Sequence, residues 1–317
     1  MTSTSIVIPS YQGAQKLNRL LGCLALQETD VEWEAVIVLD GSTDDSRQIV
    51  DRWADRVPVR LVDLGTNRGR PAALNAGFEA ASGRVLIRCD DDLAPSPDFV
   101  ATHTAHHRDR EDLGAIGYYR NILPETVYAA AYGRHASQLA LQAVYRTAED
   151  LRWMHWAGNC SATRAMFDRV GPYDEQFSAY GWEDVDWGYR LRLAGASFVI
   201  DQQLEVDHHI ASTTAAIRCR RAYLSGSAQS RFLAKHKLAS IGDRAANHQR
   251  SLWNTAVAAT SKLPVSSRES LASGVDRVGG HLPAGVTRKL IALCVESSGR
   301  AGLRAGPEVP EEISRNV

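Results

Sequence analysis

Three consecutive aspartates, Asp90, Asp91 and Asp92, are candidates for binding a ligand or a metal ion. They follow an apolar run over 84–89 that reads as a short buried strand, and residues 93–97 read as the opening of a helix. In α/β proteins, ligands bind at the carboxyl ends of parallel strands. Carboxylates crowded there need a cation, and their hard oxygen atoms suit Mg²⁺ or Mn²⁺ shared with a ligand phosphate. The alternative is a solvated acidic turn, which the preceding strand disfavours.

Polar residues also follow the other expected strands. They are Pro9, Ser10 and Tyr11 after the first, Asp40 after the second, and Asn67, Arg68 and Arg70 after the third. Each group alone fits an ordinary turn or helix cap. Together they surround one crevice with an aromatic ring, a carboxylate, arginines and backbone amides, which suits a base, a ribose and a diphosphate. The sequence contains neither GxGxxG after the first strand nor GxxxxGK[ST], so a dinucleotide site and a P-loop are not indicated.

The elements that would position these residues alternate between strand and helix. Strands are predicted over 5–9, 33–39, 59–64 and 84–89, with helices after the first three. Repeated βα units at this spacing predict an α/β fold, with a Rossmann-like, doubly wound and mostly parallel sheet and right-handed crossovers.

The composition of the chain argues against several classes of protein. A net charge of −1 over 317 residues argues against a nucleic-acid partner, and five scattered cysteines without a CxxC pair indicate reduced thiols. The first residues lack the basic region of a signal peptide, and no apolar run approaches the ~20 residues that span a bilayer. We expect a cytoplasmic protein, free or peripherally bound at the inner membrane face.

The order of the motifs resembles one family. Jointly, the runs 6–11, 38–45, 67–77 and 90–97 resemble the family 2 glycosyltransferases of the GT-A fold. The resemblance implies inverting transfer of a sugar from a nucleoside diphosphate donor, with a UDP-sugar expected, to a hydroxyl of a glycan, a lipid-linked molecule or a small molecule. It also implies Mn²⁺ or Mg²⁺ as cofactor.

Within this resemblance, specific roles fall on the polar strand ends. Asp40 is expected to contact the base. Asp90 and Asp92 form the DxD pair that binds the ribose and the metal-bound diphosphate, and Asp91 is expected beside the donor with them.

A second acidic run, Glu183, Asp184 and Asp186, opens a predicted helix. Acidic residues in a first helical turn interact favourably with the helix dipole, and Asp186 is spaced to pair with Arg190, so helix stability is one explanation. The run also resembles the family's Glu-Asp motif and the Gly-Trp-Gly-Glu-Asp type of galactosyl- and N-acetylgalactosaminyltransferases. By that likeness Asp184 is the general base for the acceptor hydroxyl, Glu183 positions the acceptor, and Asp186 holds the helix to Arg190.

Two adjacent histidines, His208 and His209, follow a further predicted strand and alone read as surface residues. The family often supplies a histidine here, so the resemblance implies His208 as a metal ligand beside Asp90 and Asp92, with His209 as the alternate. Another histidine cluster, with charged neighbours, is interpreted as a solvated helix face. Its members are His103, His106 and His107.

Aromatic residues border both parts of the expected acceptor side. Trp182 and Trp187 would wall off a site and stack on a sugar ring. The stretch 153–164 resembles the family's acceptor-side strand, which implies sugar-pocket roles for its central residues. These residues are Trp156, Gly158 and Asn159. For Trp153 and Trp156, a place in the core is an equal alternative.

Beyond residue 211 the resemblance fades. We predict a catalytic domain over 1–211, with a nucleotide-sugar half (1–115) and an acceptor half (116–211), then a helical extension over 212–306 and a flexible tail over 307–317. Residues 218–250 carry eight Lys or Arg against one acidic residue. A contact of 218–237 with a membrane surface is one hypothesis, and a solvated basic helix is the other.

Two other functions share part of this pattern. A nucleotidyltransferase would need a Gly-rich, cationic loop after the first strand, and Ser10 to Ala14 lacks it. A non-catalytic nucleotide-sugar-binding module would not need Asp90, Asp92 and Asp184 together. The sequence therefore favours a metal-dependent glycosyltransferase.

Overall fold

The computed structural model describes residues 3–177, 180–209, 213–240 and 252–307, and the chain divides into two compact units. Unit 1 comprises Met1–Ile122, Leu141–Ser178 and Glu183–His209, and unit 2 comprises Leu123–Ala140, Ala179–Trp182 and Ile210–Val317. The expected boundary at residue 211 lies outside the described residues. Unit 2 also takes in two segments from the region expected to be catalytic.

Unit 1 is built on a seven-stranded sheet of order β3-β2-β1-β4-β8-β6-β9. Its strands are β1 (Thr4–Ser10), β2 (Trp33–Leu39), β3 (Val59–Asp63), β4 (Val85–Cys89), β6 (Leu113–Ile116), β8 (Asn159–Thr163) and β9 (Ser197–Ile200). Neighbouring strands are parallel except that β8 runs antiparallel to β4 and β6. The mostly parallel α/β sheet predicted from the sequence is confirmed.

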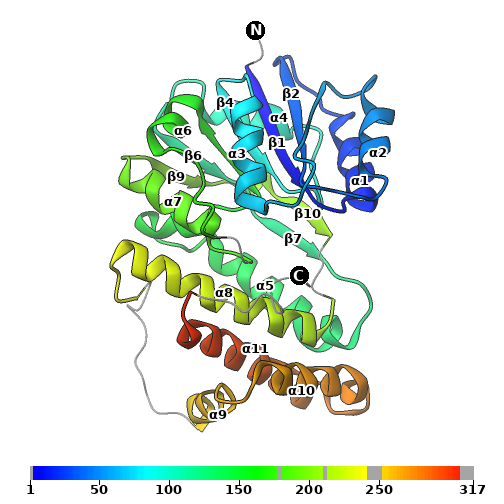
Figure 1. Cartoon of the computed structure of the whole chain (residues 1–317), viewed down its shortest axis with the longest axis vertical. Coiled ribbons are helices and arrows are strands. Elements are labelled where there is room, and N and C mark those ends of the chain that lie inside the picture. Colours follow the sequence, from blue (N-terminus) through cyan, green and yellow to red (C-terminus); the bar gives the residue numbers. More distant parts are fainter. Residues whose placement is uncertain (1–2, 178–179, 210–212, 241–251, 308–317) are drawn as a thin grey trace. The chain divides into compact units, whose positions relative to one another are not determined.

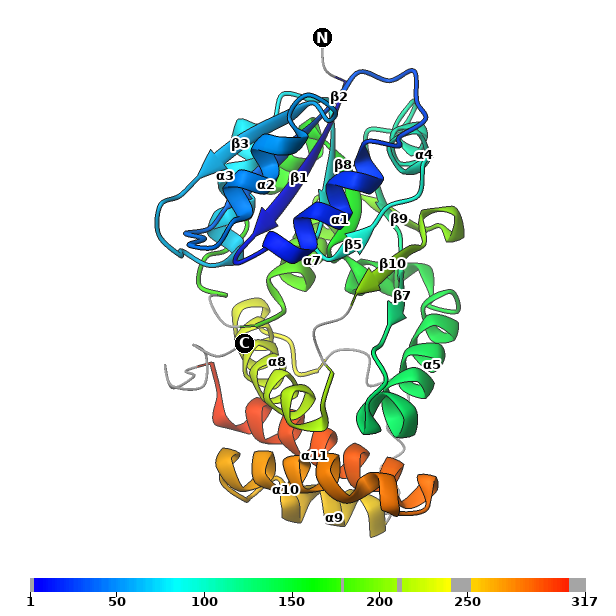
Figure 2. The ribbon, with the colours of Figure 1, turned by 90° about the vertical axis from the view of Figure 1, so that its right-hand side faces the viewer.

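Alternation along the buried strands directs side chains to two helical layers. Ile6 and Ile8 pack in the core cluster that contains the leucines of α1 (Ala14–Leu24) and Ile49 of α2 (Ser46–Trp53). Val7, between them, faces α3 (Arg70–Ala80), where a Cβ on Gly77 would lie 2.4 Å from a Val7 methyl group. Figures 1 and 2 show α3 on one face of the sheet and α1 and α2 on the other. A helix can approach so closely only with glycine at this position.

A second, three-stranded sheet has the order β5-β10-β7. Its strands are β5 (Leu93–Ala94), β7 (Tyr119–Ile122) and β10 (Val206–His209). The helix expected to open at 93–97 is therefore wrong: Leu93 and Ala94 pair with β10, and α4 (Phe99–His106) begins later. Two prolines between them, Pro95 and Pro97, delay the helix because each lacks a backbone donor and keeps the preceding residue extended.

The remaining elements complete the chain. They are the π-helical turn η1 (Ala129–Gly133), α5 (Arg134–Val144), the 3-10 helix η2 (Glu149–His155), α6 (Arg164–Val170), α7 (Glu183–Leu193), the 3-10 turn η3 (Gln202–Leu204), α8 (Ala215–His236), α9 (Leu252–Thr260), α10 (Val265–Val278), the 3-10 turn η4 (Gly279–His281) and α11 (Ala284–Ala305).

Unit 2 is helical in its described residues, with α8 and α11 side by side (Figure 1). Several basic side chains of α8 contact groups of the same unit: Arg220 pairs with Glu269, and Arg221 lies over the ring of Tyr180. None of the helices in the described part of the chain is long and apolar enough to cross a membrane. Membrane contact through 218–237 stays a prediction.

Candidate functional site

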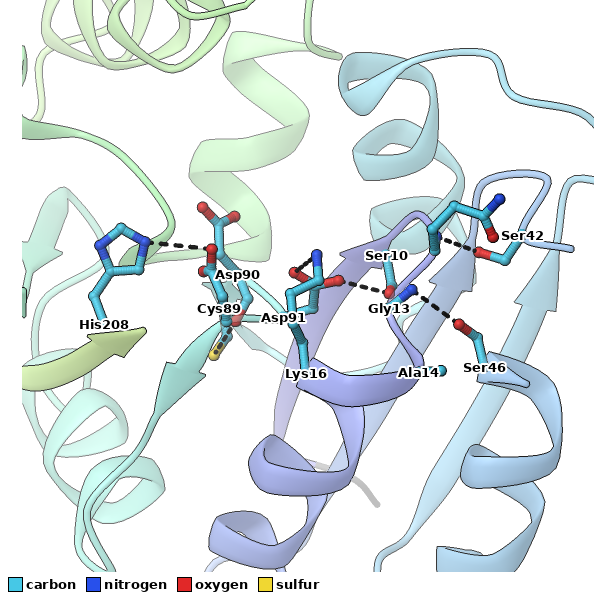
Figure 3. Close-up of polar contacts among 12 residues, drawn as sticks. Ser10, Gly13, Ala14, Lys16, Ser42, Ser46, Cys89, Asp90, Asp91 and His208 are labelled. Atoms are coloured by element: carbon cyan, nitrogen blue, oxygen red, sulfur yellow. Dashed lines mark hydrogen bonds and ion pairs between the residues drawn. The ribbon is translucent and has the colours of Figure 1, made fainter. Parts of the chain in front are cut away.

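The Asp triplet at the end of β4 divides into residues with different surroundings. Asp91 is buried, accepts a hydrogen bond from Ser10 Oγ at 2.7 Å, and forms an ion pair with Lys16 Nζ at 2.8 Å. Burial raises the pKa of Asp91, and Lys16 and Ser10 oppose that shift. In Figure 3, His208 lies on one side of the Asp90–Asp91 turn, and Ser10 and Lys16 lie on the other. The structure thus uses Asp91 and Ser10, both expected at the donor, to hold the turn to β1 and α1.

Asp90 lies beside a buried arginine. Its Oδ1 is 3.0 Å from Nη2 of Arg88, whose side chain is 1% exposed. Burial opposes ionisation of Asp90, but Arg88, Arg70 and His208 outweigh it and hold its pKa below the usual range. The backbone N–H of Asp90 donates to the carbonyl of Gly158, where a Cβ would lie 2.2 Å from Cγ of Asp90. Gly158 therefore makes room for Asp90 directly.

Asp92 and His208 bring together a carboxylate and an imidazole, both of which are common metal ligands. Nε2 of His208 lies 3.3 Å from Oδ2 of Asp92, while Oδ1 of Asp92 is buried with no hydrogen-bond partner among the described residues. Nδ1 of His208 lies 2.7 Å from Oδ1 of Asn121, a partner that fixes the ring and leaves Nε2 for a ligand. Strand register produces this arrangement, because His208 on β10 lies opposite Leu93 on β5 and Asn121 on β7.

Within the described ranges, no group of three or more His, Cys, Asp or Glu side chains is arranged to hold a metal ion. Magnesium, and by the same chemistry manganese, is often bound by one or two protein ligands together with substrate phosphates, which Asp92 and His208 fit. The backbone N–H of the adjacent His209 donates to the carbonyl of Asp92, and partial burial lowers the pKa of the His209 side chain.

The expected nucleotide-binding loops lie at the ends of β1, β2 and β3. Both carboxylate oxygens of Asp40 accept backbone N–H groups, from Arg68 at 2.7 Å and Gly69 at 2.9 Å. Asp40 therefore shapes the loop that follows Asn67, and its contact with a base stays a prediction. Tyr11 is half exposed at the end of β1, which keeps its ring accessible, whereas Pro9 is buried within β1.

The three carboxylates at the start of α7 also differ in their surroundings. Asp186 is fully buried and pairs with Nε of Arg190 at 2.9 Å, which confirms the predicted ion pair and shows it to be internal. Asp184 forms an ion pair with Nη1 of Arg88. Glu183 is 2% exposed, lies 3.5 Å from Nη1 of Arg70, and keeps Oε2 without a hydrogen-bond partner among the described residues. Asp184 and Glu183 therefore lie beside Arg88 and Arg70, whereas Asp186 is paired within α7.

Of the three tryptophans expected at a sugar pocket, two lie in the core. Trp156 and Trp187 are buried and stacked, with ring centroids 5.0 Å apart, and each indole N–H is bonded inside the protein. They form the core, so the expectation that Trp187 walls off a site is wrong and Trp156 shows no open face. Trp182 belongs to unit 2, where its indole donates to Ser225 and its ring packs on Phe232.

Asn159, the first residue of β8, is buried as well and belongs to a polar network with α4 and η3. Its amide donates to the Leu204 carbonyl and its oxygen contacts Nε2 of His103. His103 and His107 both contact Ser161 Oγ, and burial lowers the pKa of His103 to about 3 and of His107 to about 4. The solvated face expected for this cluster is wrong for His103 and His107, which are fully buried. Their partners on β8 are distant in sequence, which a pattern of charged neighbours does not reveal.

Three site residues escaped the sequence interpretation: Arg88, Lys16 and Asn121. A charge inside the apolar run 85–89 was the available signal for Arg88. For Lys16 and Asn121 there was none, because each acquires its role only through a partner on another element.

Residues 5–171 match the family model described as "Glycosyl transferase family 2". Over 227 residues the chain is 32% identical to the validoxylamine A glucosyltransferase of Streptomyces hygroscopicus subsp. jinggangensis (strain 5008), an alignment that covers 63% of this chain and 53% of that protein. It is 28% identical over 225 residues to the hyaluronan synthase of Pasteurella multocida, with 61% and 23% covered. The chain thus spans about half the length of the glucosyltransferase, or less for the synthase.

Solved structures are similar over most of the chain. The mannosyltransferase PcManGT of Pyrobaculum calidifontis, in complex with GDP-Man and Mn²⁺, has a TM-score of 0.58 at 18% identity, with 94% of this chain and 86% of that chain covered. S. aureus TarS 1-349 in complex with UDP has a TM-score of 0.53 at 17% identity, with 95% and 92% covered. At these identities the likeness establishes the fold, which is GT-A.

Proposed function

The chain belongs to glycosyl transferase family 2, and we propose that it is an inverting hexosyltransferase that uses a metal-bound nucleoside diphosphate sugar and Asp184 as general base. The observation that carries the proposal is the Arg88 guanidinium, which contacts both Asp90 of the DxD motif and Asp184. A donor-binding carboxylate and a candidate base therefore lie on either side of one buried group. A nucleotidyltransferase or a simple binding module has no use for a base at this place.

On the donor side, Asp92 and His208 would hold Mn²⁺ or Mg²⁺, and Asn121 would keep the His208 ring oriented. When bound, the metal would neutralise the charge that develops on the leaving diphosphate. Two structurally similar proteins are solved with such ligands, TarS 1-349 with UDP and PcManGT with GDP-Man and Mn²⁺, which supports a nucleotide-sugar donor here. Tyr11 offers an exposed ring for the base, and the amides of the 67–69 loop, held by Asp40, shape the same edge.

On the acceptor side, Asp184 would take the proton from the attacking hydroxyl as the oxygen approaches the sugar carbon from the face opposite the diphosphate. The nearby Oε2 of Glu183, buried without a hydrogen-bond partner among the described residues, would accept a hydrogen bond from an acceptor hydroxyl. Arg70, which is 45% exposed and close to Glu183, would balance the charge of these carboxylates.

A donor screen tests the proposal. Purified protein is incubated with UDP-, GDP- and dTDP-sugars in the presence of Mn²⁺, and release of the nucleoside diphosphate is measured. We expect hydrolysis of one donor above the rest, abolished by EDTA and restored by Mn²⁺. Release of pyrophosphate from nucleoside triphosphates, with no donor hydrolysed, would identify a nucleotidyltransferase instead.

A further inference from the structure

A buried arginine lies between the two carboxylates on which this mechanism depends. Arg88 is on β4, two residues before Asp90, with its side chain 1% exposed. Its Nη2 lies 3.0 Å from Oδ1 of Asp90, and its Nη1 forms an ion pair with Oδ1 of Asp184. The guanidinium carbon also lies 6.0 Å from the ring centroid of Tyr173. One side chain thus joins the end of the central strand to the first turn of α7.

The place of this arginine argues for a specific role. A guanidinium on a buried strand loses several kcal/mol of hydration, and apolar residues of similar size often serve stability as well or better. The planar guanidinium presents separate N–H groups in a fixed geometry, whereas a lysine ammonium is a single point charge on a flexible stem. Arginine therefore holds two carboxylates at a set separation, which lysine does not.

We propose that Arg88 is a positioning residue that holds Asp184 at a fixed place relative to Asp90, and so sets the base against the sugar carbon of the bound donor. This inference rests on the proposed role of Asp184. Because Arg88 is buried, it acts through the two carboxylates and not by touching the substrate. A shift of a reacting group by ~1 Å can cost ~10²-fold in rate, so loss of the two guanidinium contacts should reduce turnover strongly.

The test is a double-mutant cycle on hydrolysis of whichever donor sugar the wild type turns over fastest with Mn²⁺. The variants are Arg88→Lys, Asp184→Asn and the double variant. We expect Arg88→Lys to lower kcat by ~10²-fold with KM for the donor within a few-fold, since its charge still balances Asp90. In the Asp184→Asn background, Arg88→Lys should change kcat little, because the base that it positions is already gone.

A merely structural role gives a different result. Arg88→Lys would then lower the melting temperature and reduce kcat by the same factor in both backgrounds, which would overturn the proposal, as would a wild-type kcat for Arg88→Lys alone. Arg88→Gln, a neutral planar amide, covers poor folding of the lysine variant. Its effect on kcat should show the same dependence on Asp184 in the two backgrounds, whereas KM for the donor is not expected to be preserved, because Asp90 loses its balancing charge.

The matched control is Arg190→Lys, which alters the ion pair of α7 with Asp186 and does not contact Asp184. It should lower the melting temperature and leave kcat unchanged. Failure of the proposed function is distinguishable: Asp184→Asn alone would then keep full activity, whatever Arg88→Lys does.

Discussion

The acidic run at the end of β4 and the acidic run at the start of α7 look alike in sequence. Strand geometry decides which carboxylate of the first run is buried, and helix geometry decides it in the second. After β4, Asp91 is turned inside to Lys16 and Ser10, and its neighbours Asp90 and Asp92 face other partners. In α7 the helical repeat turns Asp186 inside to Arg190. In both runs one carboxylate anchors its own element, and the others lie beside different charged partners. The position of a carboxylate relative to the backbone repeat therefore matters more than its residue type.

The largest effect should follow from the α7 run. Asp184→Asn keeps the shape of the side chain and removes the proton acceptor, so kcat should drop by ~10²–10⁴-fold. Affinity for the donor nucleotide with Mn²⁺ should stay within a few-fold, because the proposed metal ligands are elsewhere. Steady-state kinetics and calorimetry measure the two effects. Near-normal rates for Asp184→Asn, with Glu183→Gln inactive, would move the base to Glu183.

Substitutions in the acidic run after β4 should impair donor binding first and turnover only as a consequence. Asp92→Ala should remove metal-dependent binding of the donor nucleotide first, with activity lost as a consequence. Asn121→Ala, which frees the His208 ring, should lower the apparent Mn²⁺ affinity by ~10–100-fold. Calorimetry with and without EDTA tests both variants. Equal nucleotide affinity with and without metal in the wild type would remove the basis for this assignment.

The two anchoring carboxylates should affect stability and leave the chemistry intact. Asp186→Asn leaves Arg190 with its bonds to the Val170 and Pro172 carbonyls, so we expect a loss of about 2 kcal/mol in the free energy of unfolding, between the values for exposed and fully buried pairs. Asp91→Asn should cost a similar amount, because Lys16 is partly exposed and can recover some hydration. Urea denaturation gives the cost. A collapse of kcat per folded molecule in either variant would show that the division into anchors and reactive groups is false.

A pH-dependent effect of similar size should come from the two buried histidines that contact Ser161. His103 and His107 bind a proton near pH 6.5 in the unfolded chain but only near pH 3 and pH 4 in the folded chain. Between these values the unfolded state binds more protons, so the free energy of unfolding falls as pH falls from about 6.5. Each histidine should contribute a factor of about ten in the folding equilibrium per pH unit.

Denaturation of the wild type and of His103→Gln at pH 7 and pH 5 measures this contribution. We expect a weaker pH dependence in the variant. His106→Gln is the control, because that ring is partly exposed and contacts Asp201. An identical pH dependence in the wild type and His103→Gln would contradict burial of a neutral ring.

Much of the fold could be predicted from the sequence because its signals are local. The four predicted strands of the N-terminal half correspond to β1 to β4, with small differences at their ends, since apolar runs of this length between helical patterns favour a parallel sheet. The helix expected at 93–97 failed because a two-residue strand is stabilised only by its partner, β10, over a hundred residues later. The sequence could not place Trp156 and Trp187 for a related reason: by residue type each fits a sugar pocket or a core equally well, and only packing decides.

By itself, the sequence determined the α/β class, the acidic runs and their place at the ends of a strand and a helix, because the periods of apolar residues set where elements begin and end. Tertiary structure decided which carboxylate of each run faces inward. It also brought Asn121 to His208 through the register of β10 with β7, and it placed Arg88 between Asp90 and Asp184. These contacts join residues far apart along the chain, and their energies depend on burial and distance, which exist only once the sheet has formed.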